Sequence, residues 1–250
     1  MQNLPFGVQN LPLGVQNLPL GVQNLPLGVQ NLPILQQEIM PKLLLATNNR
    51  GKVREIQALL NDLDVELILP ADLGLELLVT EEGQTYAENA ARKALAFARA
   101  SGRIALGDDS GLEVDALDGK PGLHSHRFAP WPDATDANRR AYLLQRLQGR
   151  PRPWTARFRA TVAVATPAGE VRYAVGACEG EIIPEERGTN GFGYDPIFLI
   201  PALGKTMAEL SMDEKNRLSH RARAIQNALP ILKEMLLRMK DEGGRMKDER

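Results

Sequence analysis

The chain has 250 residues, a formal net charge of −1 and 43% hydrophobic residues, so it can bury a substantial core. Its sequence pI of about 6.3 disfavours a protein whose main partner is nucleic acid. The single cysteine, Cys178, excludes an intramolecular disulfide, and core packing in a reducing compartment is its expected role. No apolar run approaches membrane-spanning length, so we expect a cytoplasmic protein with no membrane partner.

Both ends of the chain carry seven-residue repeats. The sequence Gln-Asn-Leu-Pro recurs five times between Gln2 and Pro33, and its prolines and glycines exclude a helical heptad. Residues 1–39 are therefore expected to be a disordered extension upstream of a natural start at Met40. A charged repeat interrupted by two glycines predicts a flexible tail over 239–250. The folded domain is then expected at 40–238.

The first predicted elements form a strand, a polar turn and a helix. The apolar run 42–46 is typical of a buried parallel strand, and the polar turn Thr47 to Lys52 follows it. The helix after the turn has an apolar stripe formed by Val53, Ile56, Leu59, Leu60 and Leu63. Backbone N–H groups at such a helix start, together with Lys52, suit an anion, although a helix cap beside a solvated lysine explains the turn equally well.

A second strand at 65–69 leads to the acidic loop 80–83 and to a helix over 85–101 that ends at Gly102. The segment 107–111 follows the next apolar run and contains Asp108 and Asp109 between two glycines. We expect a loop at a strand end, in which a divalent cation would relieve the repulsion between adjacent carboxylates. An ordinary surface turn is the alternative interpretation.

The second half of the chain predicts a strand at 112–116, a helix at 136–147, and a hairpin of two strands around the turn 167–169. These elements indicate an α/β fold with a mixed sheet. Several arginines surround Trp154 and resemble a nucleic-acid patch. Alternation of Arg157 and Arg159 with apolar residues is better explained by one solvated face of a sheet, so we expect no nucleic-acid partner.

Two further polar clusters lie near the C-terminus. Segment 188–195 places three glycines around Phe192, which suggests a stacking surface for a flat ring with Asp195 as a polar contact; a glycine-rich turn is the alternative. Ser211 opens a short helix that carries Lys215. A break near Leu218 should let Ser219 cap a new helix, with His220 and Arg221 in its first turn.

Five segments, in this order, resemble motifs of the XTP/dITP diphosphatase family, also called inosine triphosphate pyrophosphatases. They are Thr47-Asn-Asn-Arg-Gly-Lys52, Gly83-Gln-Thr-Tyr-Ala-Glu-Asn89, Asp108-Asp-Ser-Gly111, Gly191-Phe-Gly-Tyr-Asp195 and Glu214-Lys-Asn-Arg-Leu-Ser-His-Arg221. The resemblance runs from about Met40 to Leu236. Asn48 replaces a common glycine and His126 a usual alanine, and neither change removes a charge.

The resemblance implies Mg2+-dependent hydrolysis of deaminated purine nucleoside triphosphates such as ITP, dITP and XTP. The products would be the nucleoside monophosphate and pyrophosphate, and the reaction would keep deaminated purines out of DNA and RNA. The implied architecture is a two-lobed α/β fold, with a long mixed sheet flanked by helices and a nucleotide cleft between the lobes. The implied assembly is a homodimer.

By position, the resemblance makes Asp109 the catalytic base and a metal ligand, and Glu81 the second metal ligand in preference to Glu76 and Glu82. The implied substrate-binding residues are Thr47, Asn48, Asn49, Arg50, Gly51, Lys52, Ser110, Phe192, Gly193, Tyr194, Asp195, Lys215, His220 and Arg221. Two rival functions stay open: a pyrophosphatase for modified pyrimidine or canonical nucleotides, and a nucleotide sensor that has lost catalysis.

Overall fold

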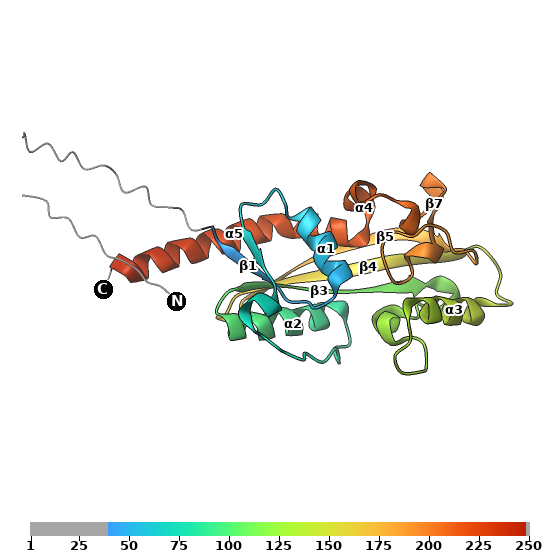
Figure 1. Ribbon diagram of the computed structural model, residues 1–250, viewed down its shortest axis with the longest axis horizontal. Coiled ribbons are helices and arrows are strands. Elements are labelled where there is room, and N and C mark those ends of the chain that lie inside the picture. The colour runs from blue at the N-terminus through green and yellow to red at the C-terminus, as the bar shows by residue number, and fades with distance from the viewer. Residues whose placement is uncertain (1–39, 249–250) are drawn as a thin grey trace, which may run out of the picture. The chain divides into compact units, whose positions relative to one another are not determined.

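The computed structural model describes residues 40–248, with side chains described to residue 239. The repeats expected to form an extension at 1–39 lie outside the described residues. Figure 1 shows a long sheet between two layers of helices, with α2 and α3 on one side and α1, α4 and α5 on the other. This arrangement confirms the α/β class.

The sheet has seven strands in the order β2-β1-β3-β4-β5-β6-β7. Strand β1 is parallel to β2 and β3, and all later neighbours are antiparallel, so the sheet is mixed as expected. The strands are β1 Lys42–Leu45, β2 Glu66–Ile68, β3 Ile104–Val114, β4 Trp154–Ala165, β5 Val171–Ile182, β6 Phe198–Ile200 and β7 Lys205–Thr206. The long strands β3, β4 and β5 run the length of the sheet (Figure 1) and connect its two ends.

The helices begin and end close to the predicted residues because their capping signals are used. They are α1 Arg50–Leu59, α2 Tyr86–Ser101, α3 Asp136–Leu147, α4 Met212–Leu218 and α5 His220–Asp248. Thr85 caps α2, and Gly102 ends it in the left-handed conformation. Ser219 ends α4, and its hydroxyl accepts from the Ala222 N–H of α5 at 3.1 Å. The expected break before His220 is therefore confirmed.

Three clusters of buried side chains form the core, and they make up two lobes of the fold. Helices α1 and α5 cover one face with side chains such as Ile56 and Ile225, while α2 covers the other with Ala90 and Ala94. These two clusters form the first lobe. The third cluster forms the second lobe at the other end of β3, β4 and β5, where α3 and β6 pack. Cys178 belongs to this third cluster, and burial raises its thiol pKa to about 11, as expected for a packing residue.

The expected loop at 107–111 is wrong, because β3 continues through both aspartates to Val114. The glycines allow close approach of other backbone instead of a turn. A Cβ at Gly107 would lie 2.4 Å from the Ala90 carbonyl oxygen of α2, and one at Gly111 would lie 2.2 Å from the Gly122 carbonyl oxygen. Since successive strand residues face opposite ways, Asp108 and Asp109 lie on opposite faces of the sheet.

Helix α5 extends to Asp248, so most of the segment 239–250 is helical in place of the expected flexible tail. Gly243 and Gly244 each cost a helix about 1 kcal/mol, but Met, Lys, Glu and Arg around them favour it. Within the described residues, no helix is long and apolar enough to cross a membrane.

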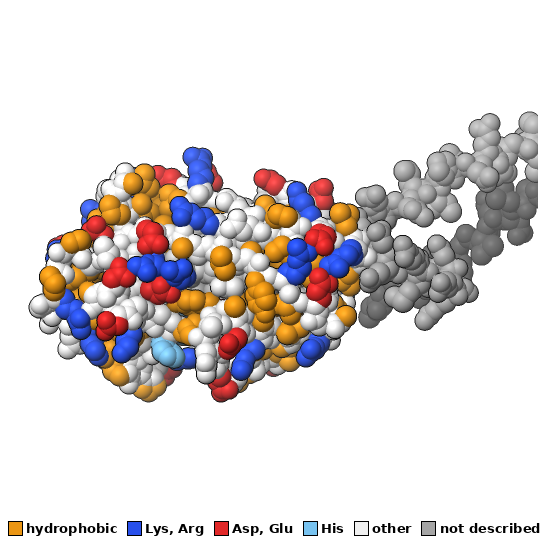
Figure 2. Space-filling model, turned by 180° about the vertical axis from the view of Figure 1, so that it is seen from behind, with side chains coloured by type: hydrophobic (Ala, Val, Ile, Leu, Met, Phe, Trp, Pro, Cys, Tyr) orange, Lys and Arg blue, Asp and Glu red, His pale blue; other side chains and the backbone are white. Residues whose placement is uncertain are grey.

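Two of the arginines around β4 are paired with carboxylates. Arg157 pairs with Asp115 and Glu179, and Arg159 pairs with Glu113, as one charged face of a sheet requires. Figure 2 shows basic and acidic side chains interspersed on the face seen from behind. The absence of a nucleic-acid partner stays a prediction.

Candidate active site

A cavity of about 760 Å³ is lined by residues of both lobes, and its size suits a nucleotide. The predicted site residues meet there with one exception: Arg50 does not line the cavity, whereas Arg54, one turn later, does. The predicted residues in its lining are Thr47, Asn48, Asn49, Gly51, Lys52, Glu81, Asp109, Ser110, Phe192, Gly193, Tyr194, Asp195, Lys215, His220 and Arg221. Motifs that are far apart in the sequence therefore meet at this one cavity.

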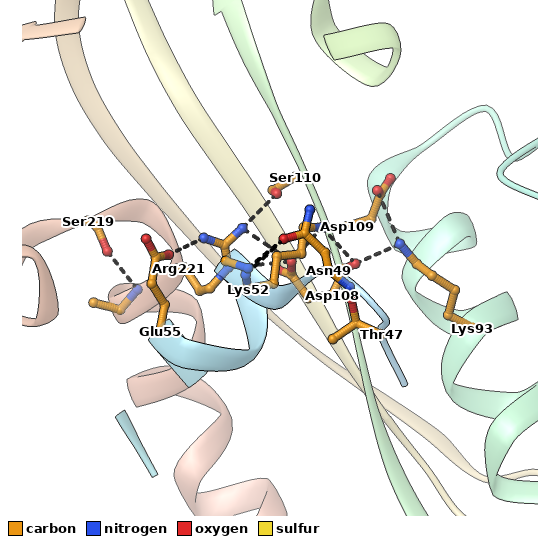
Figure 3. Close-up of polar contacts among 12 residues, drawn as sticks. Thr47, Asn49, Lys52, Glu55, Lys93, Asp108, Asp109, Ser110, Ser219 and Arg221 are labelled. Atoms are coloured by element: carbon orange, nitrogen blue, oxygen red, sulfur yellow. Dashed lines mark hydrogen bonds and ion pairs between the residues drawn. The ribbon is translucent and has the colours of Figure 1, made fainter. Parts of the chain in front are cut away.

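On the α2 side of the sheet, two carboxylates lie around one ammonium group. Lys93 Nζ of α2 is 2.8 Å from Glu81 Oε1 and 3.4 Å from Asp109 Oδ1. The amide of Asn89, also in α2, donates to Asp109 Oδ2 at 3.1 Å. Figure 3 shows Lys93 reaching from α2 toward Asp109. The structure thus brings Glu81 and Asp109 together through Lys93.

This pair of carboxylates fits Mg2+ by its donor chemistry. Magnesium sites commonly use one or two carboxylates and complete the shell with water and phosphate oxygens. Within the described part of the chain, no three His, Cys, Asp or Glu side chains gather as a metal site. An ion held by Glu81 and Asp109 would leave coordination positions for water and substrate oxygens.

The pKa values of the two carboxylates are shifted in opposite directions. Burial raises the pKa of Asp109, and the nearby Lys93 and Lys52 only partly oppose it. Burial also acts on Glu81, but Lys93 outweighs it and holds the pKa of Glu81 below its usual value. A carboxylate with a raised pKa is the stronger proton acceptor, so Asp109 suits the role of base.

On the opposite face of β3, Asp108 belongs to a buried ionic network. Its carboxylate lies 2.7 Å from Lys52 Nζ and 3.3 Å from Arg221 Nη2. Burial disfavours its charge, but Arg221 and Lys52 outweigh burial and hold the pKa of Asp108 well below the usual range. The expected sharing of one cation by the adjacent aspartates is therefore wrong, because the strand separates their side chains.

The network continues through Glu55 of α1, which was not predicted. Glu55 accepts from Arg221 Nη1 and lies 2.7 Å from Lys215 Nζ, and Lys215 lies 2.9 Å from Asp195. Figure 3 shows Arg221 between Glu55 and Ser110, whose hydroxyl it contacts at 3.0 Å. Three cations, Lys52, Lys215 and Arg221, thus balance three buried carboxylates, and all of these residues except Asp108 line the cavity.

Phe192 connects the two lobes across the cavity. Lys215 Nζ lies 5.9 Å and the Arg221 guanidinium 5.7 Å from its ring centroid, which are cation–π distances. A Cβ at Gly51 would lie 2.6 Å from the ring, so the ring needs a glycine at the start of α1. Phe192 therefore contacts Gly51 and Arg221 of the other lobe.

His220 is buried at the first turn of α5. Its ring stacks on Phe158 with centroids 4.8 Å apart and an interplanar angle of 18°. Burial, followed by the nearby Arg221, lowers its pKa to about 3, so the imidazole is neutral at pH 7. Its Nδ1 is buried without a hydrogen-bond partner among the described residues, so one polar atom is left for a ligand.

The start of α1 is less open to an anion than predicted. The side chain of Asn49 accepts from the N–H groups of Gly51 at 2.9 Å and Lys52 at 3.1 Å. These two N–H groups are thereby satisfied as in an ordinary helix cap. The charge offered to an anion here comes from the Lys52 side chain, which lines the cavity.

Sequence reasoning missed Glu55, Asn89 and Lys93, although each had a signal. Asn89 and Lys93 are four residues apart in α2 and stand among the buried alanines of that helix. Glu55 precedes the buried Ile56 in α1. Charged or amide side chains within an apolar helix stripe indicate buried polar partners elsewhere in the fold.

Comparisons with known proteins agree with this geometry. A sequence model of the Ham1 family matches residues 43–231. A dITP/XTP pyrophosphatase of Desulforamulus reducens is 47% identical over 197 residues, which cover 78% of this chain and 98% of that protein. One of Geobacillus kaustophilus is 47% identical over 187 residues, covering 74% and 91% of the two chains. The structure of a HAM1 protein from Coxiella burnetii matches with a TM-score of 0.71 and 39% identity, covering 78% of this chain and all of that one.

Proposed function

The chain belongs to the Ham1 family, and from this premise we propose that it hydrolyses non-canonical purine nucleoside triphosphates such as dITP, ITP and XTP. The proposed products are the nucleoside monophosphate and pyrophosphate, and the proposed role is cleansing of the nucleotide pool. The observation that carries the proposal is the single cavity with Glu81 and Asp109 on one side and Lys52 with Arg221 on the other.

The reaction needs an activated water and a neutralised leaving group. Asp109, with its raised pKa, orients a water and accepts its proton. Lys52 neutralises the charge that develops on the departing pyrophosphate. Glu81 and Asp109 would hold Mg2+, which supplies Lewis-acid polarisation of the phosphate oxygens when bound. No covalent nucleophile is required.

His220 gives a physical basis for choosing the base. Inosine and xanthine carry an acceptor oxygen at C6, where adenine carries an amino donor. The N–H groups of Arg221 already contact Glu55, Asp108 and Ser110, whereas Nδ1 of His220 has no partner among the described residues and is a donor in the neutral tautomer that carries its hydrogen on Nδ1. Against adenine this donor would stay unpaired, at a cost of about 1–3 kcal/mol.

The test is a substrate panel with the purified full-length chain. ITP, XTP, GTP, ATP and a modified pyrimidine triphosphate are compared with and without Mg2+, and pyrophosphate is measured separately from orthophosphate. We expect Mg2+-dependent pyrophosphate release that is fastest with ITP and XTP. Orthophosphate as the first product, or equal rates with ATP, would refute the proposal, and nucleotide binding without release would support the sensor.

Replacing Phe192 by alanine should weaken nucleotide binding by about 1–3 kcal/mol through lost stacking on the base, with little effect on the fold. The dissociation constant for IMP by calorimetry and the melting temperature check both parts. Phe128→Ala is the control, since Phe128 lies in the same lobe, packs on Tyr142 and does not line the cavity. Unchanged IMP affinity in a folded Phe192→Ala variant would exclude stacking on this ring.

The homodimer and the cytoplasmic location are also proposals. The homodimer follows from the family resemblance, and the location follows from the single, buried cysteine, which suits a reducing compartment. Sedimentation at micromolar concentration distinguishes a dimer of 27.5 kDa chains from a monomer.

A further inference from the structure

Gly193, which follows Phe192, is held at both its backbone N–H and its backbone carbonyl by side chains of α3. The N–H of Gly193 donates to Asp136 Oδ2 at 2.8 Å, and the Gly193 carbonyl accepts from Arg140 Nη1 at 2.8 Å. Asp136 and Arg140 lie one turn apart on α3, so both can reach the backbone of the same residue. Gly193 itself has a φ of +64°, a conformation that glycine adopts without strain.

Arg140 is itself held in place by an ion pair with Glu186. Its Nε and Nη2 donate to the two oxygens of Glu186 at 2.8 Å each, which is a bidentate arrangement. Its side chain is 12% exposed and does not line the cavity. Arg140 therefore has no route to the substrate except through the Gly193 peptide.

The neighbouring contacts make the Phe192 ring depend on that peptide. The Phe192 N–H donates to Asp195 Oδ2 at 3.0 Å, and the hydroxyl of Tyr194 donates to the Ser125 carbonyl at 2.9 Å. These bonds fix residues on either side of Gly193, and Asp136 with Arg140 fixes Gly193 itself. A shift of this peptide would move the ring away from Gly51 and from the cations beside it.

We propose that Asp136 and Arg140 form a clamp on the Gly193 peptide that positions the Phe192 ring for nucleotide binding, with Arg140 as a positioning residue. The inference rests on the proposed function, because it assigns a role in holding the nucleotide. The clamp acts on binding and leaves the reacting phosphates untouched. It should therefore change KM more than kcat.

Arg140→Met tests the clamp because it keeps the aliphatic stem and removes the guanidinium. We expect KM for ITP to rise roughly three- to tenfold with kcat within about twofold of the parent. Hydrogen exchange of the Gly193 amide should accelerate about tenfold or more. Arg140→Lys should recover part of both effects, since one ammonium can reach the carbonyl or Glu186 but not both.

Arg172→Met is the matched control, because Arg172 of β5 also pairs with a glutamate, Glu234 of α5. Neither residue of this pair lines the cavity. It should leave KM and Gly193 exchange unchanged. The clamp is refuted if Arg140→Met changes neither quantity, if exchange accelerates without a change in KM, or if Arg172→Met has equal effects. If the parent cleaves no nucleotide, the proposed function fails, and with it the positioning role. The exchange of Gly193 then still shows whether the two side chains hold the peptide.

Discussion

Asp109→Asn is expected to reduce pyrophosphate release from ITP by about 10²–10⁴-fold, the usual cost of losing a general base. Weakened binding of Mg2+ would add to this loss, because a carboxamide is a poor substitute for a metal-binding carboxylate. Steady-state rates over a range of Mg2+ concentrations separate the two effects. A deficit that remains at saturating Mg2+ is the cost of the base.

The fold of this variant should survive. Burial raises the pKa of Asp109 above its unfolded value, so its charge costs stability at pH 7, and a neutral amide removes that cost. The melting temperature should therefore not fall below the parent's, and the reason is desolvation and not repulsion by Asp108. Asp133→Asn is the control, since Asp133 is exposed in a left-handed conformation that asparagine tolerates. Turnover within a few-fold of the parent would refute the catalytic role of Asp109.

Arg221→Met is expected to destabilise the protein by about 3–5 kcal/mol, because it removes the shared cation of two buried carboxylates. Glu55 and Asp108 would remain in the interior, with Lys215 and Lys52 as their other cations. Urea denaturation at pH 7 measures the loss. Arg223→Met, at an exposed position on the same helix, should change the free energy of unfolding by much less.

The pH dependence of this loss has a definite sign. In the parent, the pKa values of Asp108 and Glu55 are depressed, so they stabilise the fold above their unfolded pKa values and lose this contribution as pH falls. Without Arg221, burial is opposed only by the remaining lysines, so both pKa values rise relative to those in the parent and protonation relieves the variant at a higher pH. The difference between variant and parent should therefore be smaller near pH 4 than at pH 7. A difference that grows on acidification would contradict the network.

Much of the fold follows from local signals in the sequence. Thr85 and Gly102 bound α2, and Ser211 and Ser219 separate α4 from α5, because capping depends on residues within one turn of the helix end. The hairpin of β4 and β5 follows from alternation around the turn 167–169. Nearly all of the site residues that the family motifs predict line the cavity, although they are far apart in the chain.

What the sequence could not show depends on contacts between distant elements. Asp, Ser and Gly are common in turns, so the acidic pair was predicted in a loop, whereas its glycines accommodate α2 and the Gly122 backbone. Glu55 and Lys93 acquire their roles only when α1 and α2 pack on opposite faces of β3. Arg50 and Lys52 look equally suited to an anion in the sequence, yet only Lys52 lines the cavity.

The alternation of β3 has a consequence for the length of this chain. Asp108 supports the ionic network on one face, and Asp109, the proposed base, pairs with Lys93 on the other. A single residue inserted or deleted before them within the strand would exchange the two carboxylates between the faces of the sheet. Both the ionic network and the pairing of Asp109 with Lys93 would then be lost. The turn at 167–169, at the far end of β4, carries no such constraint. The register of strand β3 is therefore fixed, and we expect insertions and deletions in related chains to lie in the loops.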